Sequence, residues 1–94
     1  VSFASAEYVD ILADVKTKKW EDQILFRYVR TDGVVGHLMV RDLYERIKEL
    51  HAGRGFCFTA GGFSESAEKW VEARLIDLIS KEKLIQYLNK VDNG

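Results

Sequence analysis

Two arginines stand in a stretch that otherwise has the apolar character of a strand, ILFRYVRTDGVVG over residues 24–36. A basic run, KTKK at residues 16–19, lies a few positions before it. Guanidinium and ammonium groups bind phosphate oxygens, so a groove lined by these side chains would add salt-sensitive affinity for a nucleic-acid backbone. The candidate phosphate-binding residues are Lys16, Lys18, Lys19, Arg27 and Arg30. The alternative is an ordinary solvated loop, because Asp14, Glu21 and Asp22 would weaken any positive field there.

Other reactive side chains are sparse in this chain. Cys57 is the single cysteine, which excludes an internal disulfide framework and a cysteine-based zinc site, and its apolar neighbours predict a small buried hydrophobe. His37 and His51 are 14 residues apart, far from the spacing that puts two imidazoles on one helical face. Gly61 and Gly62 lack the rest of a phosphate-loop signature and indicate a tight turn instead.

The composition is that of one ordinary globular domain. A chain of 94 residues supports one hydrophobic core, and 47% hydrophobic with 31% charged residues is typical of such domains. No apolar run approaches the roughly 18 residues that cross a membrane, so we expect no membrane insertion by this segment. The net charge of −1 means that any contact with nucleic acid must be local. The start at Val1 and the single cysteine lead us to expect one domain over residues 1–94, excised from a longer cytoplasmic protein.

Hydrophobic periodicity predicts an α/β fold with the element order β-β-α-β-α-β-α. Strands at residues 8–15 and 24–30 are joined by a charged connection and form an antiparallel hairpin. Residues 37–51 have apolar side chains at helical spacing, and Gly53 follows where a left-handed cap is common. The stretch at residues 55–60 is apolar on both faces, which predicts a central strand covered on both sides.

The C-terminal half predicts a βαβ unit and a last helix. Ser64 is the expected N-cap of a helix over residues 64–74, which leads into a strand at residues 75–79. Parallel pairing with a right-handed crossover follows for such a unit. Ser80 is the expected cap of the last helix. The apolar face of that helix consists of Leu84, Ile85, Leu88 and Val91. The predicted architecture is an α/β sandwich whose mixed sheet has the hairpin at one side and a parallel pair at the other.

Three segments together resemble the Mrr-type restriction endonuclease family of the PD-(D/E)xK superfamily: VVGHLMVRDLYERI, GRGFCFTAGGFSESAEKW and LIDLISKEKLIQYL. The resemblance covers roughly residues 8–91 and implies a restriction-endonuclease-like mixed sheet flanked by helices. It also implies cleavage of DNA with a divalent metal, usually Mg²⁺. In that family an acidic residue on one strand and a carboxylate or amide on the next hold the ion, and a lysine two residues later orients the attacking water.

The family's catalytic positions are substituted here. Asp10 matches the acidic position, but Arg27 stands where the second ligand belongs and Val29 stands where the lysine belongs. A guanidinium about 4 Å from a divalent ion costs on the order of 8 kcal/mol at an effective dielectric near 20, and valine cannot orient water. We therefore expect a catalytically degenerate site with no cofactor. Asp10 would be the remaining ligand if Mg²⁺ were held at all.

Two alternatives keep a nuclease possible. A one-residue slip would put Tyr28 and Arg30 in the motif, and a lysine from residues 16–19 could replace the missing one. The sequence thus favours a DNA-binding or assembly module, with a metal-dependent endonuclease or a purely structural, protein-interaction domain as alternatives. The expected partners are double-stranded DNA, neighbouring domains of a longer chain, or a second copy in a homodimer.

Overall fold

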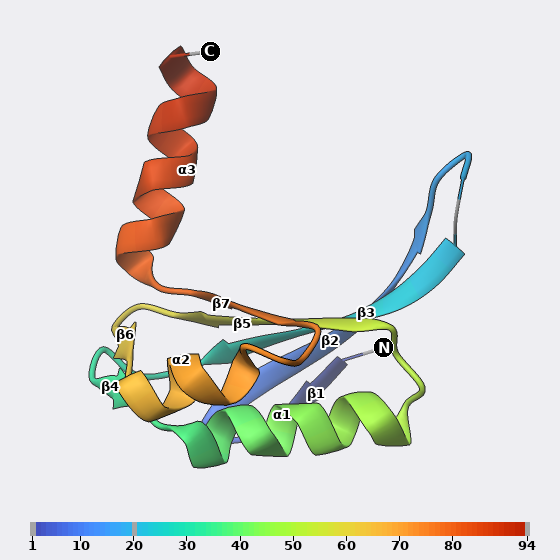
Figure 1. The fold of residues 1–94 in the computed structure, drawn as a ribbon, viewed down its shortest axis with the longest axis horizontal. Helices are drawn as coiled ribbons and strands as arrows, with labels where there is room; N and C mark the ends of the chain where they lie inside the picture. Colours follow the sequence, from blue (N-terminus) through green and yellow to red (C-terminus); the bar gives the residue numbers. More distant parts are fainter. Residues whose placement is uncertain (1, 20, 94) are drawn as a thin grey trace.

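The computed structural model describes residues 2–19 and 21–93 and is a five-stranded mixed sheet with two helices on one face (Figure 1). The elements in chain order are β1 (Ser2–Ala4), β2 (Tyr8–Lys16), β3 (Glu21–Val29), β4 (Val34–Val35), α1 (His37–Glu49), β5 (Arg54–Thr59), β6 (Gly62–Phe63), α2 (Glu65–Val71), β7 (Ile76–Ile79) and α3 (Lys81–Asn93). The predicted α/β class and mixed sheet are confirmed. No helix among the described residues is both long enough and apolar enough to cross a membrane.

The sheet has the strand order β1-β2-β3-β5-β7. The pairs β1 with β2 and β2 with β3 are antiparallel, whereas β3 with β5 and β5 with β7 are parallel. Helices α1 and α2 make the two crossovers, which place β5 inside the sheet between β3 and β7. The middle strand of the five is β3, so the prediction that residues 55–60 form the central strand is wrong in this detail. A separate two-stranded sheet of β4 and β6 was not predicted, because two-residue strands carry no periodicity.

The β2–β3 hairpin is longer than its sequence predicts. Strand β2 runs through Lys16 and β3 begins at Glu21, so part of the expected charged connection is strand, and β3 ends at Val29 rather than Arg30. Figure 1 shows the tip of this hairpin curling away from the layer of α1 and α2. Charged residues fit the strand positions at the tip because side chains such as Lys16 and Glu21 are exposed there.

The left-handed residue after α1 is His51, with φ 55°, and no described glycine has a positive φ. The expectation of a glycine cap at Gly53 is therefore wrong. A Cβ at Gly53 would overlap the carboxylate of Asp22, so this glycine permits a close approach of α1's exit to the hairpin.

Helix α2 has the predicted cap and an earlier end. The Ser64 side chain accepts a hydrogen bond from the Ala67 N–H at 3.1 Å, as its position predicts. The helix ends at Val71 rather than residue 74, because the chain must return to pair beside β5, where the Gly55 N–H donates to the Leu75 carbonyl at 2.9 Å. Ser80 caps α3 as predicted by accepting from the Lys83 N–H at 3.2 Å.

The hydrophobic core lies between α1, α2 and one face of the sheet. Its buried apolar side chains are Leu25, Val29, Val35, Val40, Leu43, Ile47, Cys57, Ala67 and Ile76. Within residues 2–19 and 21–93, no helix lies flat on the other face of the sheet, and α3 projects away from it (Figure 1). The prediction that β5 is covered on both sides is therefore wrong: its residues alternate between buried and half-buried.

Candidate active site

The strand register brings the substituted catalytic positions together. Asp10 of β2 lies directly opposite Arg27 of β3, and Val29 lies opposite Tyr8 two residues further along. Because side chains alternate along a strand, Arg27 and Val29 point to the same buried face, toward α1. Tyr28 points to the open face and is 48% exposed, so the register rules out the one-residue slip.

Arg27 is held as a fully buried cation by two carboxylates. Its Nε and Nη2 atoms donate to Oδ1 and Oδ2 of Asp10 at 2.6 and 2.7 Å, and both side chains are 0% exposed. The third nitrogen, Nη1, donates to Oδ2 of Asp42 on α1 at 2.8 Å and to the Met39 carbonyl at 3.3 Å. The guanidinium carbon lies 3.8 Å from the centre of the Tyr8 ring, a cation–π contact.

These contacts decide the ionisation of the site. Burial by itself lowers the pKa of Arg27, but the hydrogen bonds and charges of Asp10 and Asp42 outweigh it, so the pKa of Arg27 is raised above its ordinary value. Cys57 lies opposite Arg27 on β5, and burial raises the pKa of its thiol to about 12. The thiol is therefore neutral near pH 7 and behaves as the buried hydrophobe that its sequence context predicts.

This residue set does not fit a divalent cation. Both oxygens of Asp10 already accept hydrogen bonds from a guanidinium, and Val29 presents only methyl groups. Within residues 2–19 and 21–93, no three His, Cys, Asp or Glu side chains gather as a metal ligand set. The arrangement instead ties β2, β3 and α1 together through one bidentate and one single ion pair.

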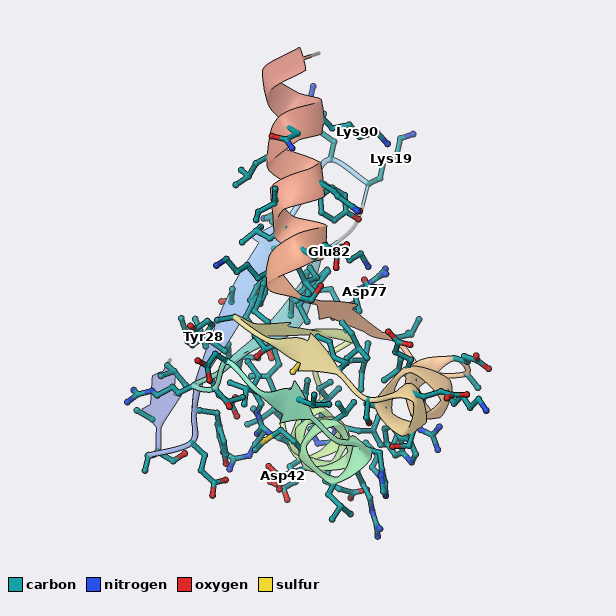
Figure 2. All side chains as sticks on the ribbon, turned by 90° about the vertical axis from the view of Figure 1, so that its left-hand side faces the viewer. Lys19, Tyr28, Asp42, Asp77, Glu82 and Lys90 are labelled. Atoms are coloured by element: carbon teal, nitrogen blue, oxygen red, sulfur yellow. The ribbon has the colours of Figure 1, made fainter. Side chains whose placement is uncertain are left out.

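The five candidate phosphate-binding residues do not gather in one place. Lys16, Lys18 and Lys19 are exposed at the tip of the hairpin, and Figure 2 shows Lys19 far from Asp42. Lys16 lies six positions after Asp10 on β2, which is about 20 Å at roughly 3.3 Å per residue. Arg30 is exposed just past the opposite end of β3. Arg27 is buried, so its guanidinium is not presented to a phosphate.

Sequence reasoning did not identify Asp42 or Tyr8 as partners of Arg27. Asp42 stands next to Leu43, at the border of the apolar stripe of α1, three residues after Met39. An acidic residue at such a border is a usable signal once a buried arginine is suspected on the strand beneath it. The position of Tyr8 beside Arg27 follows only from the strand register.

Comparisons with known proteins agree with this fold. The family model of the Mrr catalytic type, described as a restriction endonuclease, matches residues 4–88. Among solved structures, the DNA modification-dependent restriction endonuclease AspBHI is similar, with a TM-score of 0.61 and 16% sequence identity. The match covers 90% of this chain and 23% of that one, so this chain corresponds to about a quarter of its length. The search of curated proteins finds no match.

Proposed function

The chain belongs to the Mrr-type restriction endonuclease family, and from this premise we propose that it is a catalytically degenerate member that serves as a binding or assembly module. The buried ion pair between Asp10 and Arg27 carries the proposal. A guanidinium that occupies both oxygens of the family's acidic residue competes directly with a metal ion for the same lone pairs. Val29 leaves the water-orienting role without a polar group.

A lysine from the hairpin tip is poorly placed to replace the lysine that is missing at Val29. The hairpin lysines begin about 20 Å from Asp10 along β2, and an extended lysine side chain reaches only a fraction of that distance. Any lysine that did approach would meet a carboxylate that Arg27 already neutralises. The geometry therefore favours a domain that has kept the fold and lost the chemistry.

The test is a plasmid-nicking assay with Mg²⁺ or Mn²⁺. We expect the wild-type chain and the Asp10→Asn variant to leave supercoiled plasmid intact to the same extent as buffer. Asn keeps the shape of the side chain, and circular dichroism verifies that the variant is folded. Nicking by the wild type that disappears in Asp10→Asn would overturn the proposal and restore the metal-dependent endonuclease.

Binding of duplex DNA without cleavage is the second candidate function, and the exposed lysines at the hairpin tip favour it. Three phosphate contacts predict a slope of log K against log salt of about −2.7, which is roughly a 40-fold loss of affinity between 50 and 200 mM salt. Fluorescence anisotropy with a labelled duplex measures this slope. The double variant Lys18→Ala and Lys19→Ala should make the slope shallower by about two units, while Lys69→Ala on α2 should leave it unchanged. No binding at low salt would exclude this function.

A further inference from the structure

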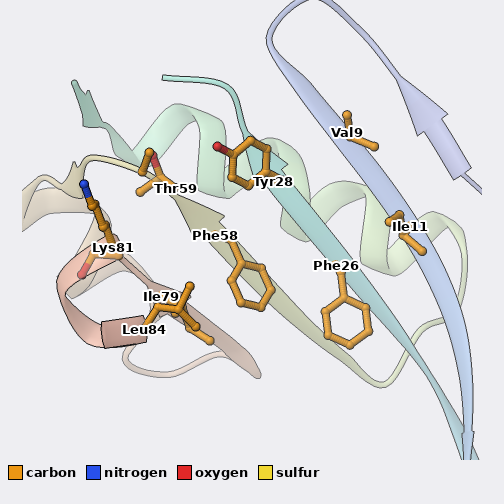
Figure 3. A pocket seen from close by; sticks show the side chains of 11 residues that line it. Val9, Ile11, Phe26, Tyr28, Phe58, Thr59, Ile79, Lys81 and Leu84 are labelled. Carbon is orange, nitrogen blue, oxygen red and sulfur yellow. The ribbon is translucent and has the colours of Figure 1, made fainter. Parts of the chain in front are cut away.

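The open face of the sheet is an apolar hollow. A cavity of about 480 Å³ lies over β2, β3, β5 and β7, and the first turn of α3 forms its rim (Figure 3). Its apolar lining includes Val9, Ile11, Phe26, Tyr28, Phe58 and Leu84. Lys81 is its charged lining residue, at one end, so the chemistry of the surface suits an apolar partner rather than a phosphate backbone.

Aromatic rings form the floor of this hollow. Phe26 stacks on Phe56 with ring centres 5.3 Å apart and lies 6.3 Å from the ring of Phe58. Phe26 and Phe58 line the hollow, and the stacking of these rings on one another and on Phe56 restricts their movement. Tyr28 and Ile11 remain about half exposed beside them. A rigid, half-exposed aromatic surface has the composition of the centre of a protein interface.

Helix α3 has an apolar face that is largely exposed beyond its first turn. Leu84, Ile85, Tyr87 and Leu88 are between 43% and 55% exposed. The helix is joined to the sheet at its first turn, where the Lys83 ammonium donates to the Leu78 carbonyl at 3.3 Å, and the rest projects away from the body (Figure 1). A helix of 13 residues is marginally stable in water without packing, so this face needs a cover.

We propose that a second copy of this chain supplies that cover by reciprocal exchange. The α3 helix of each copy lies in the hollow of the other copy's sheet, around a two-fold axis. Each chain offers one uncovered helix and one uncovered face, which is the self-complementarity that a two-fold interface requires. The exchange rests on the proposed function as an assembly module. It does not depend on whether the domain binds DNA.

The dimensions agree with this arrangement. A 13-residue helix is about 20 Å long, and four strands spaced by about 4.8 Å span about 14 Å, so α3 crosses the hollow fully. Six large apolar side chains, each about half exposed, contribute on the order of 600 Å² per copy. With the phenylalanine rings and the helix backbone this approaches the roughly 800 Å² per partner of a standard interface.

The short hinge favours exchange over folding back. Ser80 alone separates the end of β7 from the start of α3. A helix that covered its own sheet would have to reverse direction within that residue, and Ser80 is already used as the α3 cap. Short hinges of this kind favour pairing with a second molecule.

Sedimentation velocity at increasing protein concentration tests the proposal. The expected species has twice the 10.8 kDa of the chain. Leu88→Glu should raise the dimer dissociation constant at least about 100-fold, because the apolar contact of residue 88 is lost at both equivalent helix-to-face contacts of the dimer. The matched control is Leu38→Glu, since Leu38 is 66% exposed on α1, on the covered side of the sheet, and this change should leave the dimer intact. A chain that stays monomeric, or equal effects of the two variants, would overturn the proposal.

A mixing experiment distinguishes exchange from other arrangements. Leu88→Glu damages the helix and Tyr28→Glu damages the face, and both side chains are exposed in the single copy. A mixed dimer of these variants regains one intact helix-to-face contact, so an equimolar mixture should associate more strongly than either variant alone. Helix α3 docked on its own sheet predicts no gain on mixing, and that result would refute the exchange. Plasmid nicking tests the proposed loss of nuclease activity at Asp10, whereas sedimentation and mixing test the exchange of α3. Either proposal can therefore be refuted without the other.

Discussion

The buried pair of Asp10 and Arg27 predicts a strong coupling in stability. Truncating Arg27 to methionine removes the two charge-assisted hydrogen bonds to Asp10, of 2.6 and 2.7 Å, and the one to Asp42, and it leaves Asp10 as an uncompensated buried charge. The expected loss is about 3–5 kcal/mol of unfolding free energy. Asp10→Leu should cost a similar amount, because Asp42, with a side chain that is 57% exposed, remains the only carboxylate on Arg27 among the described residues.

The double variant Asp10→Leu and Arg27→Met should return to within about 1–2 kcal/mol of the wild type. It replaces a buried ion pair with apolar side chains of similar volume, an exchange that is often neutral. The coupling energy between the two sites is then at least about 3 kcal/mol. Asp42→Asn, as the exposed control, should cost less than about 1 kcal/mol, since water replaces most of what is lost.

Urea unfolding followed by circular dichroism gives these free energies, with the m value as a check that the native states remain comparable. A domain of this size has an unfolding free energy of about 5–14 kcal/mol, so a loss of about 3–5 kcal/mol would leave the single variants marginally folded. An added osmolyte, which stabilises folded states, keeps their unfolding transitions measurable. If the loss in the double variant equals the sum of the two single losses within about 0.5 kcal/mol, Asp10 and Arg27 do not stabilise each other and the prediction is refuted. An increase in stability on neutralising Asp10 would point instead to a carboxylate held for metal binding.

Three further predictions concern the rest of the fold. The thiol of Cys57 is neutral when folded, because burial raises its pKa from 9.0 to about 12. Its contribution to stability is therefore fully present below about pH 9 and is lost as pH rises toward 12, at about 1.4 kcal/mol per pH unit. Urea titrations should find this slope in the difference between the unfolding free energies of the wild type and Cys57→Ala, because tyrosine and lysine titrate equally in both. Gly61→Ala places a Cβ against the backbone of Asp32 and Gly33 and should cost about 1–3 kcal/mol, whereas Gly62→Ala meets nothing and should be neutral or slightly stabilising; equal thermal midpoints would contradict this. Ser64→Ala removes the cap of α2 and should cost about 1 kcal/mol in chemical unfolding, with Ser66→Ala in the first turn as the comparison.

Local patterns in this sequence predicted most of the elements, and the resemblance of three segments indicated the family. The alternation in β3, the helical spacing in α1 and the caps at Ser64 and Ser80 are short-range features, which depend on neighbours within a few residues. The element order then left few ways to connect a hairpin and a βαβ unit. The absence of the family's lysine at Val29 was also visible without coordinates.

Tertiary structure decided what the substituted residues do. The sequence indicated that Arg27 could not help a metal bind, but it left open whether the guanidinium pointed to solvent, to phosphate or to Asp10. Pairing across the strands and the placement of α1 brought Asp10 and Asp42 to its nitrogens, since these contacts join residues 15 and 17 positions away. The uncovered sheet face and the projecting α3 likewise follow from how the layers stack, because periodicity tells which side of an element is apolar and not what covers it.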